Sequence, residues 1–243
     1  QLQDALALMY SDRERARNHI YRCAFHQFEK GDVLHWWHNI SENQQSVHRG
    51  VRTKCSDDCL FLPYAVSCYC EYTGDTLFLD KSIFYIKGPE LSENETEKYF
   101  SPQKSDVRES LYFHSVRAVE YVLSRFGAHG IPLIGSCDWC DGFSNIGVGG
   151  KGESVWLGMF LKLVLDKFSR VCEIKKDINR AKTYRSIAKV LKKNIIDNCY
   201  DKDSGYFIRG FYDDGEKLGS ADSEECKIDI LPQCFSAISS VYD

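Results

Sequence analysis

The stretch IPLIGSCDWCDGFSNIGVGGKGESVWLG, residues 131–158, lies between two segments with helical periodicity. Its many glycines make a continuous helix unfavourable, so the stretch is predicted to be a loop between two helices. Asp138 and Asp141 lie three residues apart in it, with Trp139 between them. An aromatic ring beside a carboxyl group offers a stacking face for a sugar and an apolar wall that can keep an acid protonated. The loop is therefore predicted to carry carbohydrate chemistry.

A plainer interpretation of the same loop stays open. Asp138 and Asp141 are residue types that form turns and cap helices, and Trp139 could simply be buried. Residue types alone do not decide between these interpretations.

Helical periodicity extends outward from this loop in both directions. Asp12 is placed to cap a helix over residues 13–28, and Glu153 or Ser154 is predicted to start another. The further helices are predicted over residues 57–73, 107–126 and 177–199, with a last one over residues 228–243. YFIRGFY, followed by Asp-Asp-Gly at 213–215, predicts a short β-hairpin. The predicted fold class is all-α, built from helix hairpins.

Residues 31–56 show neither helical nor alternating periodicity and are rich in His, Trp, Arg and Asn. They are predicted to form a second functional loop. Arg49 and Arg52 in this segment precede Asp57 and Asp58, which could instead cap the next helix. His35 and His38 lack a third ligand at a firm spacing, so they are expected to cap, stack or bind a polar ligand rather than a metal.

Composition and charge exclude several classes of function. A chain of 243 residues with 43% hydrophobic content can bury a substantial core, as one large domain or two small ones. The net charge of -4 and the scattered Lys and Arg residues argue against nucleic acid or an anionic membrane surface as a partner. No apolar run approaches the roughly 20 residues of a membrane span. No membrane contact is therefore expected from this segment.

Eleven cysteines, an odd number, lie mostly within apolar patterns, where free thiols behave as small hydrophobes. This favours a reducing, cytoplasmic setting. Cys137 and Cys140 have the C-x-x-C spacing of a zinc or redox site, but a zinc site needs a second pair with suitable spacing. The segment from Asp201 to Gly205 departs from a calcium loop and predicts a turn. No metal site is therefore predicted.

Several motifs, taken in order, resemble glycoside hydrolase family 94, the inverting disaccharide and oligosaccharide phosphorylases and the phosphorylase-like domain of cyclic β-1,2-glucan synthases. The matching segments are GDVLHWWH (31–38), RGVRTKCSDDCLFLPYAV (49–66), EYTGD (71–75), HGIPLIGSCDWCDGF (129–143), GKGESVWLGMFL (150–161) and GSADSEECKIDILPQCFSAIS (219–239). The resemblance implies an (α/α)6 barrel, a helical toroid. Residues 1–243 are expected to be part of this catalytic barrel domain, truncated at both ends relative to the family.

The resemblance also assigns roles to residues. The family's general acid corresponds to Asp141, Trp139 is expected to line the sugar site, and Cys140 stands where the family usually has asparagine. The remaining candidate sugar contacts are Asp138, Arg49, Arg52, Asp57 and Asp58. No cofactor is expected, because inorganic phosphate serves as the co-substrate.

The expected activity is that of a glycosyltransferase, a glycoside phosphorylase that acts on a β-linked gluco-oligosaccharide. Phosphate is already an anion and attacks the anomeric carbon without a general base, while an acid held neutral near pH 7, desolvated by Trp139, protonates the leaving oxygen. One displacement inverts the configuration and gives α-glucose 1-phosphate. An inverting hydrolase would instead need a second carboxylate roughly 6.5–9.5 Å away, and Asp138 is too close in sequence to serve comfortably.

Three departures from the family shape the remaining expectations. The family's Arg-Asp pair is expected upstream of Gln1, its phosphate-binding segment beyond Asp243, and SENQQSV at 41–47 is longer than usual. The segment alone is therefore expected to be a weak catalyst or none. An inverting glycoside hydrolase and a catalytically inactive carbohydrate-binding fragment stay as alternatives, and a homodimer is the oligomeric state often found in the family.

Overall fold

The computed structural model describes residues 2–38 and 49–242, so the loop 41–47 lies outside the described residues. The chain divides into two compact units. Unit 1 comprises Gln1–Lys54 and Asp58–Tyr121, and unit 2 comprises Cys55–Asp57 and Val122–Asp243. Within the described part of the chain, no helix combines the length and apolar character needed to cross a membrane.

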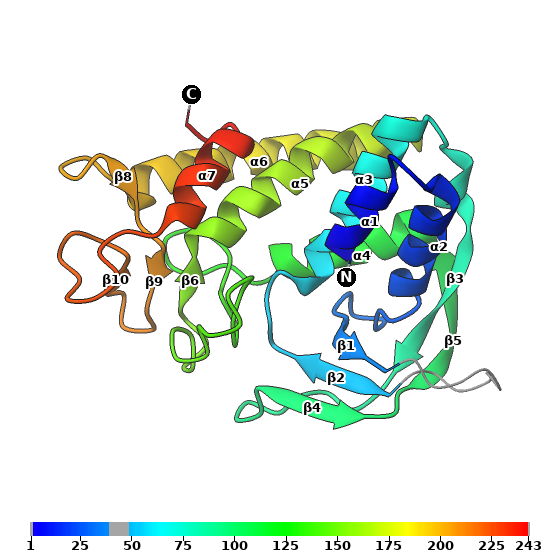
Figure 1. Ribbon diagram of the computed structural model, residues 1–243, viewed down its shortest axis with the longest axis horizontal. Coiled ribbons are helices and arrows are strands. Elements are labelled where there is room, and N and C mark those ends of the chain that lie inside the picture. The colour runs from blue at the N-terminus through cyan, green and yellow to red at the C-terminus, as the bar shows by residue number, and fades with distance from the viewer. Residues whose placement is uncertain (1, 39–48, 243) are drawn as a thin grey trace. The chain divides into compact units, whose positions relative to one another are not determined.

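Two helix ends of unit 1 lie where local capping predicts them, the start of α2 and the end of α3 (Figure 1), whereas α2 ends at Ala24 rather than at the predicted residue 28. The Asp12 carboxylate accepts a hydrogen bond from the Arg15 backbone N–H and caps α2. Gly74 ends α3 in the left-handed conformation, with φ of 69°, which glycine adopts without steric cost. The helical elements of this unit are α1 (Leu2–Leu8), α2 (Arg13–Ala24), the 3-10 turn η1 (Asp58–Leu60), α3 (Phe61–Thr73), η2 (Leu77–Asp80) and α4 (Leu111–Leu123), whose last residues belong to unit 2.

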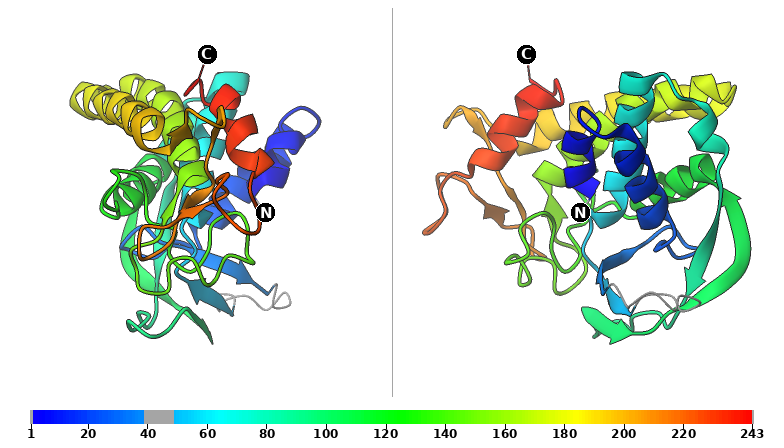
Figure 2. Two further views of the ribbon diagram at one scale, coloured as in Figure 1. Left: turned by 90° about the vertical axis from the view of Figure 1, so that its left-hand side faces the viewer. Right: turned by 45° about the vertical axis from the view of Figure 1, so that its right-hand side comes forward.

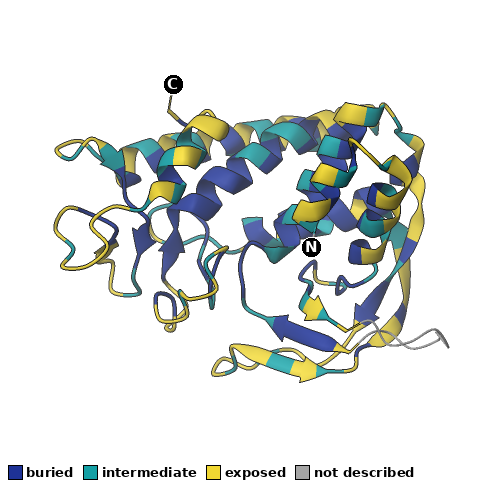
Figure 3. Cartoon of the chain, viewed as in Figure 1, coloured by how far each residue is buried: buried dark blue, intermediate teal, exposed yellow. Residues whose placement is uncertain are grey.

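Unit 1 also contains two antiparallel sheets. One has the strand order β1 (Leu34–Trp37), β2 (Gly50–Thr53), β4 (Glu97–Phe100), and the other pairs β3 (Ser82–Lys87) with β5 (Gln103–Ser110). Figure 3 shows the central β2 as buried and the edge strand β4 as largely exposed. A strand buried on both faces has no alternating pattern, which explains why residues 31–56 were wrongly predicted to be a loop throughout. Residues 107–110 are likewise strand rather than helix.

Unit 2 is built on a pair of long helices, α5 (Val155–Ile174) and α6 (Ile178–Cys199), which lie side by side in Figures 1 and 2. Ser154 caps α5 and Asp177 caps α6, each through a side-chain oxygen that accepts a backbone N–H. The predicted hairpin is confirmed as β9 (Gly210–Phe211) and β10 (Lys217–Leu218), with β6 (Glu153–Ser154) paired to β9. The unit is completed by the β7 (Tyr200–Asp201) and β8 (Tyr206–Phe207) hairpin around a turn, and by α7 (Ile230–Ile238).

The fold class is therefore mainly helical, with several small antiparallel sheets. The all-α expectation with a single hairpin is wrong in its β content, because pairing between distant segments produces strands that short-range periodicity does not indicate.

Candidate active site

Asp138 lies at the base of the predicted loop in unit 2 and is completely buried, with 0% of its surface exposed. One carboxylate oxygen accepts a hydrogen bond from the Arg209 guanidinium at 2.6 Å and another from the Cys140 backbone N–H at 3.0 Å. The other oxygen accepts the Ser154 hydroxyl at 2.5 Å. A buried carboxylate with a cation and two further donors is compensated for its loss of water. These hydrogen bonds restrain the conformation of the loop from its buried side. The role of Asp138 as a sugar contact stays a prediction.

Arg209, the cation of this network, is a residue that the sequence analysis missed. Its side chain is 1% exposed, contacts the Asp229 carboxylate at 3.4 Å and lies 4.7 Å from the centre of the Phe143 ring. Its backbone joins β10 to α5, because its N–H bonds to Leu218 and its carbonyl accepts the N–H of Val155. A single arginine within the apolar run YFIRGFY was the available signal, since a buried charge needs a partner.

Ser154 connects the loop to a rigid helix. Its hydroxyl donates to Asp138 and accepts the Leu157 backbone N–H at 3.0 Å, so the same oxygen caps α5. The Arg209 guanidinium lies 3.3 Å from this oxygen as well. Side chains on a packed helix end have few alternative positions, so the loop 138–141 is fixed relative to α5.

Above this buried base, the loop turns its next side chains outward. Trp139 is 52% exposed and Asp141 is exposed. The plainer interpretation of a buried Trp139 is therefore wrong, because the tryptophan ring is available to stack on a ligand. The described residues leave Asp141 in contact with solvent, so the desolvation expected from Trp139 is not provided by this part of the chain. Its role as the acid stays a prediction.

The segment that carries Asp57 lies directly beside this loop. The Ser56 N–H donates to the Cys137 carbonyl at 2.9 Å, and the Cys55 thiol is 3.5 Å from a carboxylate oxygen of Asp57. Asp57 is buried, with 3% of its surface exposed. The structure therefore brings Asp57 together with the loop that holds the candidate acid.

Two cysteines and the candidate acid form a cluster of possible ligand atoms. The sulfur atoms of Cys55 and Cys137 and one carboxylate oxygen of Asp141 all lie within 4.8 Å of one another. Thiolates and a carboxylate are donors that zinc accepts. The C-x-x-C spacing in the sequence instead pairs Cys137 with Cys140, because a spacing motif cannot reveal a contact between residues 82 positions apart.

The glycine-rich end of the stretch is held by a third carboxylate, that of Asp213 at the hairpin. It accepts backbone hydrogen bonds from Gly149, from Lys151 at 2.8 Å and from Gly152 at 2.9 Å. Burial acts to raise the pKa of Asp213, but these backbone donors and the Lys151 charge outweigh it, so the pKa is lowered. A β-carbon on Gly152 would lie 2.5 Å from the Ile146 carbonyl oxygen, which shows how closely the loop folds back on itself.

His129 and Glu153 form a further side-chain contact of unit 2 that sequence reasoning missed. The His129 ring nitrogen contacts the buried Glu153 carboxylate, and the His129 backbone N–H donates to the same group at 3.0 Å. The imidazole ring also stacks on Phe211 at 3.7 Å between ring centres. The pair fixes the entrance to the loop, since Glu153 belongs to β6 immediately before α5.

The predicted sugar contacts of unit 1 are held by their own partners. Arg52 is buried, donates to the Asp32 carboxylate at 2.6 Å and to the Pro89 carbonyl at 2.9 Å, and lies 3.9 Å from the centre of the Phe28 ring. Its role as a sugar contact stays a prediction. Within unit 1, the arginine also supports the sheet in which β2 is central.

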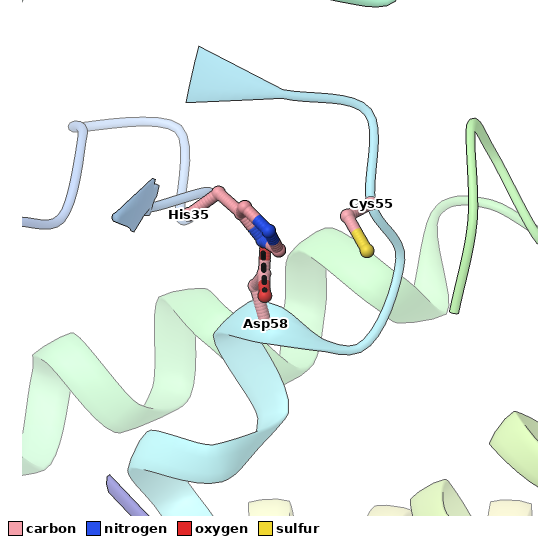
Figure 4. Close-up of side chains that lie close together, drawn as sticks. All are labelled: His35, Cys55 and Asp58. Atoms are coloured by element: carbon pink, nitrogen blue, oxygen red, sulfur yellow. Dashed lines mark hydrogen bonds and ion pairs between the residues drawn. The ribbon is translucent and has the colours of Figure 1, made fainter. Parts of the chain in front are cut away.

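Asp58 pairs with His35, one of the two histidines noted in the sequence. The His35 Nδ1 atom lies 2.9 Å from the Asp58 carboxylate, and Figure 4 shows the imidazole ring pointing toward that carboxylate. The N-cap residue of α3 is Leu60, so the helix-capping alternative for Asp57 and Asp58 is wrong. Asp58 instead starts the 3-10 turn η1 that precedes α3.

Arg49 is exposed and lies within a group of aromatic side chains on the β1-β2-β4 sheet. Its guanidinium is 4.8 Å from the centre of the Tyr99 ring. Tyr99 in turn contacts Trp36 and His38, with ring centres 5.6 Å and 6.0 Å apart. His38 therefore packs edge-to-face against these rings and does not stack on them, at interplanar angles of 79° to Trp36 and 86° to Tyr99.

Comparison with known proteins identifies the class. Residues 1–243 match the catalytic domain of the glycosyl hydrolase 94 superfamily, and the chain belongs to this family. This confirms the resemblance seen in the sequence motifs. The cyclic beta-(1,2)-glucan synthase NdvB of Rhizobium meliloti (strain 1021) is 38% identical over 243 residues, which cover 100% of this chain and 8% of that protein.

Other relatives are phosphorylases. The 3-O-beta-D-glucopyranosyl-beta-D-glucuronide phosphorylase of Paenibacillus borealis is 27% identical over 241 residues, covering 99% of this chain and 28% of that protein. Among solved structures, a rhamnosidase from Klebsiella oxytoca with rhamnose bound has a TM-score of 0.60 at 14% identity, covering 100% of this chain and 38% of that one. The chain thus spans less than a third of the length of the two curated relatives. The structural likeness concerns the fold alone.

Proposed function

We propose that this chain is part of the catalytic barrel of a glycoside phosphorylase that cleaves a β-glucosidic disaccharide or oligosaccharide with inorganic phosphate. The observation that carries the proposal is that two aspartates of one loop lie in different environments, one buried and one exposed. Asp138 is buried against Arg209 and Ser154, while Asp141 is exposed beside the exposed Trp139. A fixed loop that presents one carboxyl group and one aromatic face suits a sugar-cleaving site.

The proposed reaction needs one acid from this loop. Asp141, in its protonated form, donates a proton to the glycosidic oxygen as the bond to the anomeric carbon breaks. A phosphate oxygen attacks that carbon from the opposite face, which inverts its configuration and gives α-glucose 1-phosphate and a shortened sugar. Trp139 stacks on the sugar ring during this step. The transfer of a glucosyl group to phosphate makes the enzyme a glycosyltransferase.

The geometry of Asp138 separates this proposal from hydrolysis. An inverting hydrolase uses a second carboxylate as a base toward water, roughly 6.5–9.5 Å from the acid. Both Asp138 oxygens already accept hydrogen bonds, one of them from a buried arginine. Asp138 is also 0% exposed, so neither of its oxygens is available to bind and activate a water molecule.

The proposed architecture extends that of the family. The α5 and α6 pair of unit 2 is the type of helix hairpin from which an (α/α)6 barrel is assembled. The short coverage of the relatives supports the proposal that residues 1–243 form only part of such a barrel domain. We therefore expect full activity from the full-length protein.

The test uses the full-length protein with β-linked gluco-oligosaccharides, with and without inorganic phosphate. Release of α-glucose 1-phosphate is expected only with phosphate, and Asp141→Asn should reduce it by about 10²-fold or more, the contribution of a general acid. Asp203→Asn, an exposed aspartate in the turn after β7, is the matched control and should keep wild-type activity.

Two results would contradict the proposal. Equal cleavage without phosphate would identify an inverting hydrolase. Sugar binding without cleavage by the folded full-length protein would identify a catalytically inactive carbohydrate-binding protein.

A further inference from the structure

Two cysteines that are far apart in the sequence meet beneath the candidate acid. The sulfur atoms of Cys55 and Cys137 are 2.6 Å apart, although 82 positions separate the residues. Both side chains are buried. The contact lies within unit 2, to which both residues belong.

Backbone pairing holds the two cysteines against each other. Cys55 forms an antiparallel bridge with Gly135, and the Ser56 N–H donates to the Cys137 carbonyl at 2.9 Å. The Ser56 hydroxyl donates to the same carbonyl at 3.1 Å. The approach of the sulfur atoms is therefore set by the main chain on both sides, and it does not depend on a rotamer of an exposed side chain.

We propose that Cys55 and Cys137 form a reversible disulfide when the protein meets a hydroperoxide. One thiolate attacks the peroxide, which oxidises its sulfur to a sulfenic acid and releases the reduced oxygen as water after protonation. The second thiol then attacks that sulfur, an S–S bond forms, and the hydroxyl group leaves as water. In total, two thiols and one hydrogen peroxide give one disulfide and two water molecules.

The separation of the sulfur atoms favours a disulfide over a zinc site. Two sulfurs bound tetrahedrally to zinc at about 2.3 Å lie roughly 3.8 Å apart, whereas a disulfide bond is about 2.05 Å long. The observed 2.6 Å is closer to the bond length. Forming the disulfide therefore needs a smaller change in the separation of the sulfur atoms than opening the pair around a cation.

The disulfide would act on the site through its neighbours. It joins the segment of Cys55 and Asp57 to the loop of Cys137 and Asp141, whose carboxylate oxygen lies within 4.8 Å of both sulfurs. This consequence rests on the proposed function, because it concerns the candidate acid. We expect oxidation to hold the two segments together and to change the rate of sugar cleavage.

The decisive measurement is a map of disulfides in the full-length protein after treatment with hydrogen peroxide. Thiols that have not reacted are alkylated before tryptic digestion. The expected product joins the peptides 55–81 and 126–151. Its mass is two hydrogens below the sum of the two peptides alkylated at their other cysteines, and fragmentation places the bond at Cys55 and Cys137. Dithiothreitol should separate the peptides again.

Serine variants of single cysteines show which thiols form the linked peptide. Cys55→Ser and Cys137→Ser should each abolish the linked peptide, whereas Cys234→Ser, at an exposed cysteine, should leave it unchanged. A bond between Cys137 and Cys140, or no bond at all in the wild-type protein, would overturn the proposal. Tight, stoichiometric zinc binding by the reduced protein that is lost in both serine variants would replace it with a metal site.

The activity assay separates this proposal from the proposed function. A peroxide-dependent change in the rate of phosphorolysis should disappear in Cys55→Ser. If the linked peptide forms while the protein shows no phosphorolysis, the disulfide stands and the proposed function fails. If phosphorolysis occurs but no linked peptide forms, the proposed function stands and the disulfide proposal fails.

Discussion

Among the described residues, each unit contains a buried arginine–aspartate pair, and the two pairs differ in how completely the aspartate oxygens are bonded. In unit 2, both Asp138 oxygens accept hydrogen bonds, and the Arg209 and Asp138 side chains are 1% and 0% exposed. In unit 1, the Arg52 and Asp32 side chains are 7% and 10% exposed, and one Asp32 oxygen has no hydrogen-bond partner among the described residues. Arg209 Nε also lacks a hydrogen bond, although it lies 3.4 Å from the Asp229 carboxylate. The pair in unit 2 is thus the drier one, and its aspartate is the more fully bonded of the two.

The difference shows where buried charge is used for positioning. A buried ion pair contributes little net stability compared with an apolar pair, but it fixes geometry because each partner is costly to leave alone. Asp138 is bonded to the turn at Cys140, to the cap of α5 and to Arg209, and these three contacts define one loop conformation. Among the described residues, the Asp32 carboxylate accepts a hydrogen bond only from Arg52, so it restrains the conformation of its surroundings less than Asp138 does.

The largest expected effect is the loss of Arg209. Arg209→Met leaves the Asp138 charge buried without a cation, so we expect the free energy of unfolding to fall by about 3–5 kcal/mol. Urea denaturation of the full-length protein measures this change, with Lys202→Met at an exposed position as the control. A loss no larger than that of the control would show that the pair does not hold the loop.

Replacing Arg52, the arginine of the unit 1 pair, should lower the free energy of unfolding by less than replacing Arg209. Arg52→Met removes a charged hydrogen bond from the Asp32 side chain, which is 10% exposed against 0% for Asp138, and we expect a loss of about 2 kcal/mol, the value of a hydrogen bond to a charged group. The same denaturation assay ranks the two variants. If Arg52→Met proved the more damaging, the contrast between the two pairs would be reversed.

Ser154→Ala sharpens the comparison by removing a neutral member of the Asp138 network. The variant loses the cap of α5 and one donor to Asp138, so we expect a loss of about 1.5–2 kcal/mol. Asp177→Ala removes only the cap of α6 and should cost about 1 kcal/mol. Equal losses in the two variants would indicate that the bond from Ser154 to Asp138 adds nothing.

Asp213 gives the smallest effect and one that depends on pH. Its lowered pKa means that the carboxylate stabilises the fold above the unfolded aspartate value of about 3.9, and that this contribution is lost as the pH falls through the lowered folded value. Asp213→Asn should therefore lower the free energy of unfolding by about 1 kcal/mol at pH 7. The difference from wild type should shrink on acidification below pH 4, and a difference independent of pH would contradict the role of its charge.

The parts of this structure that could be predicted from sequence are those governed by neighbouring residues. Asp12 and Ser154 cap the helices that follow them, and Gly74 ends α3, because each acts within a few positions along the chain. The motif around Asp141 was found for the same reason, since the loop residues are contiguous.

The parts that could not be predicted depend on partners far along the chain. Arg209 meets Asp138 across 71 positions, and Cys55 meets Cys137 across 82. Strand β2 is buried on both sides, so its residues carry no alternating pattern, and its Arg52 is buried only because Asp32 lies beside it. Such pairings follow from the tertiary fold, which overrides local preference.

The shared contacts of Asp138, Ser154 and Arg209 have a consequence for how this protein can change over generations. Each of the three side chains bonds to the other two, so replacing any one leaves a buried polar group without its partner. We therefore expect the residue types at these three positions to vary together among related sequences. Ser154 lies 16 positions from Asp138 and 55 from Arg209, so this covariation would link a local pair with a distant position.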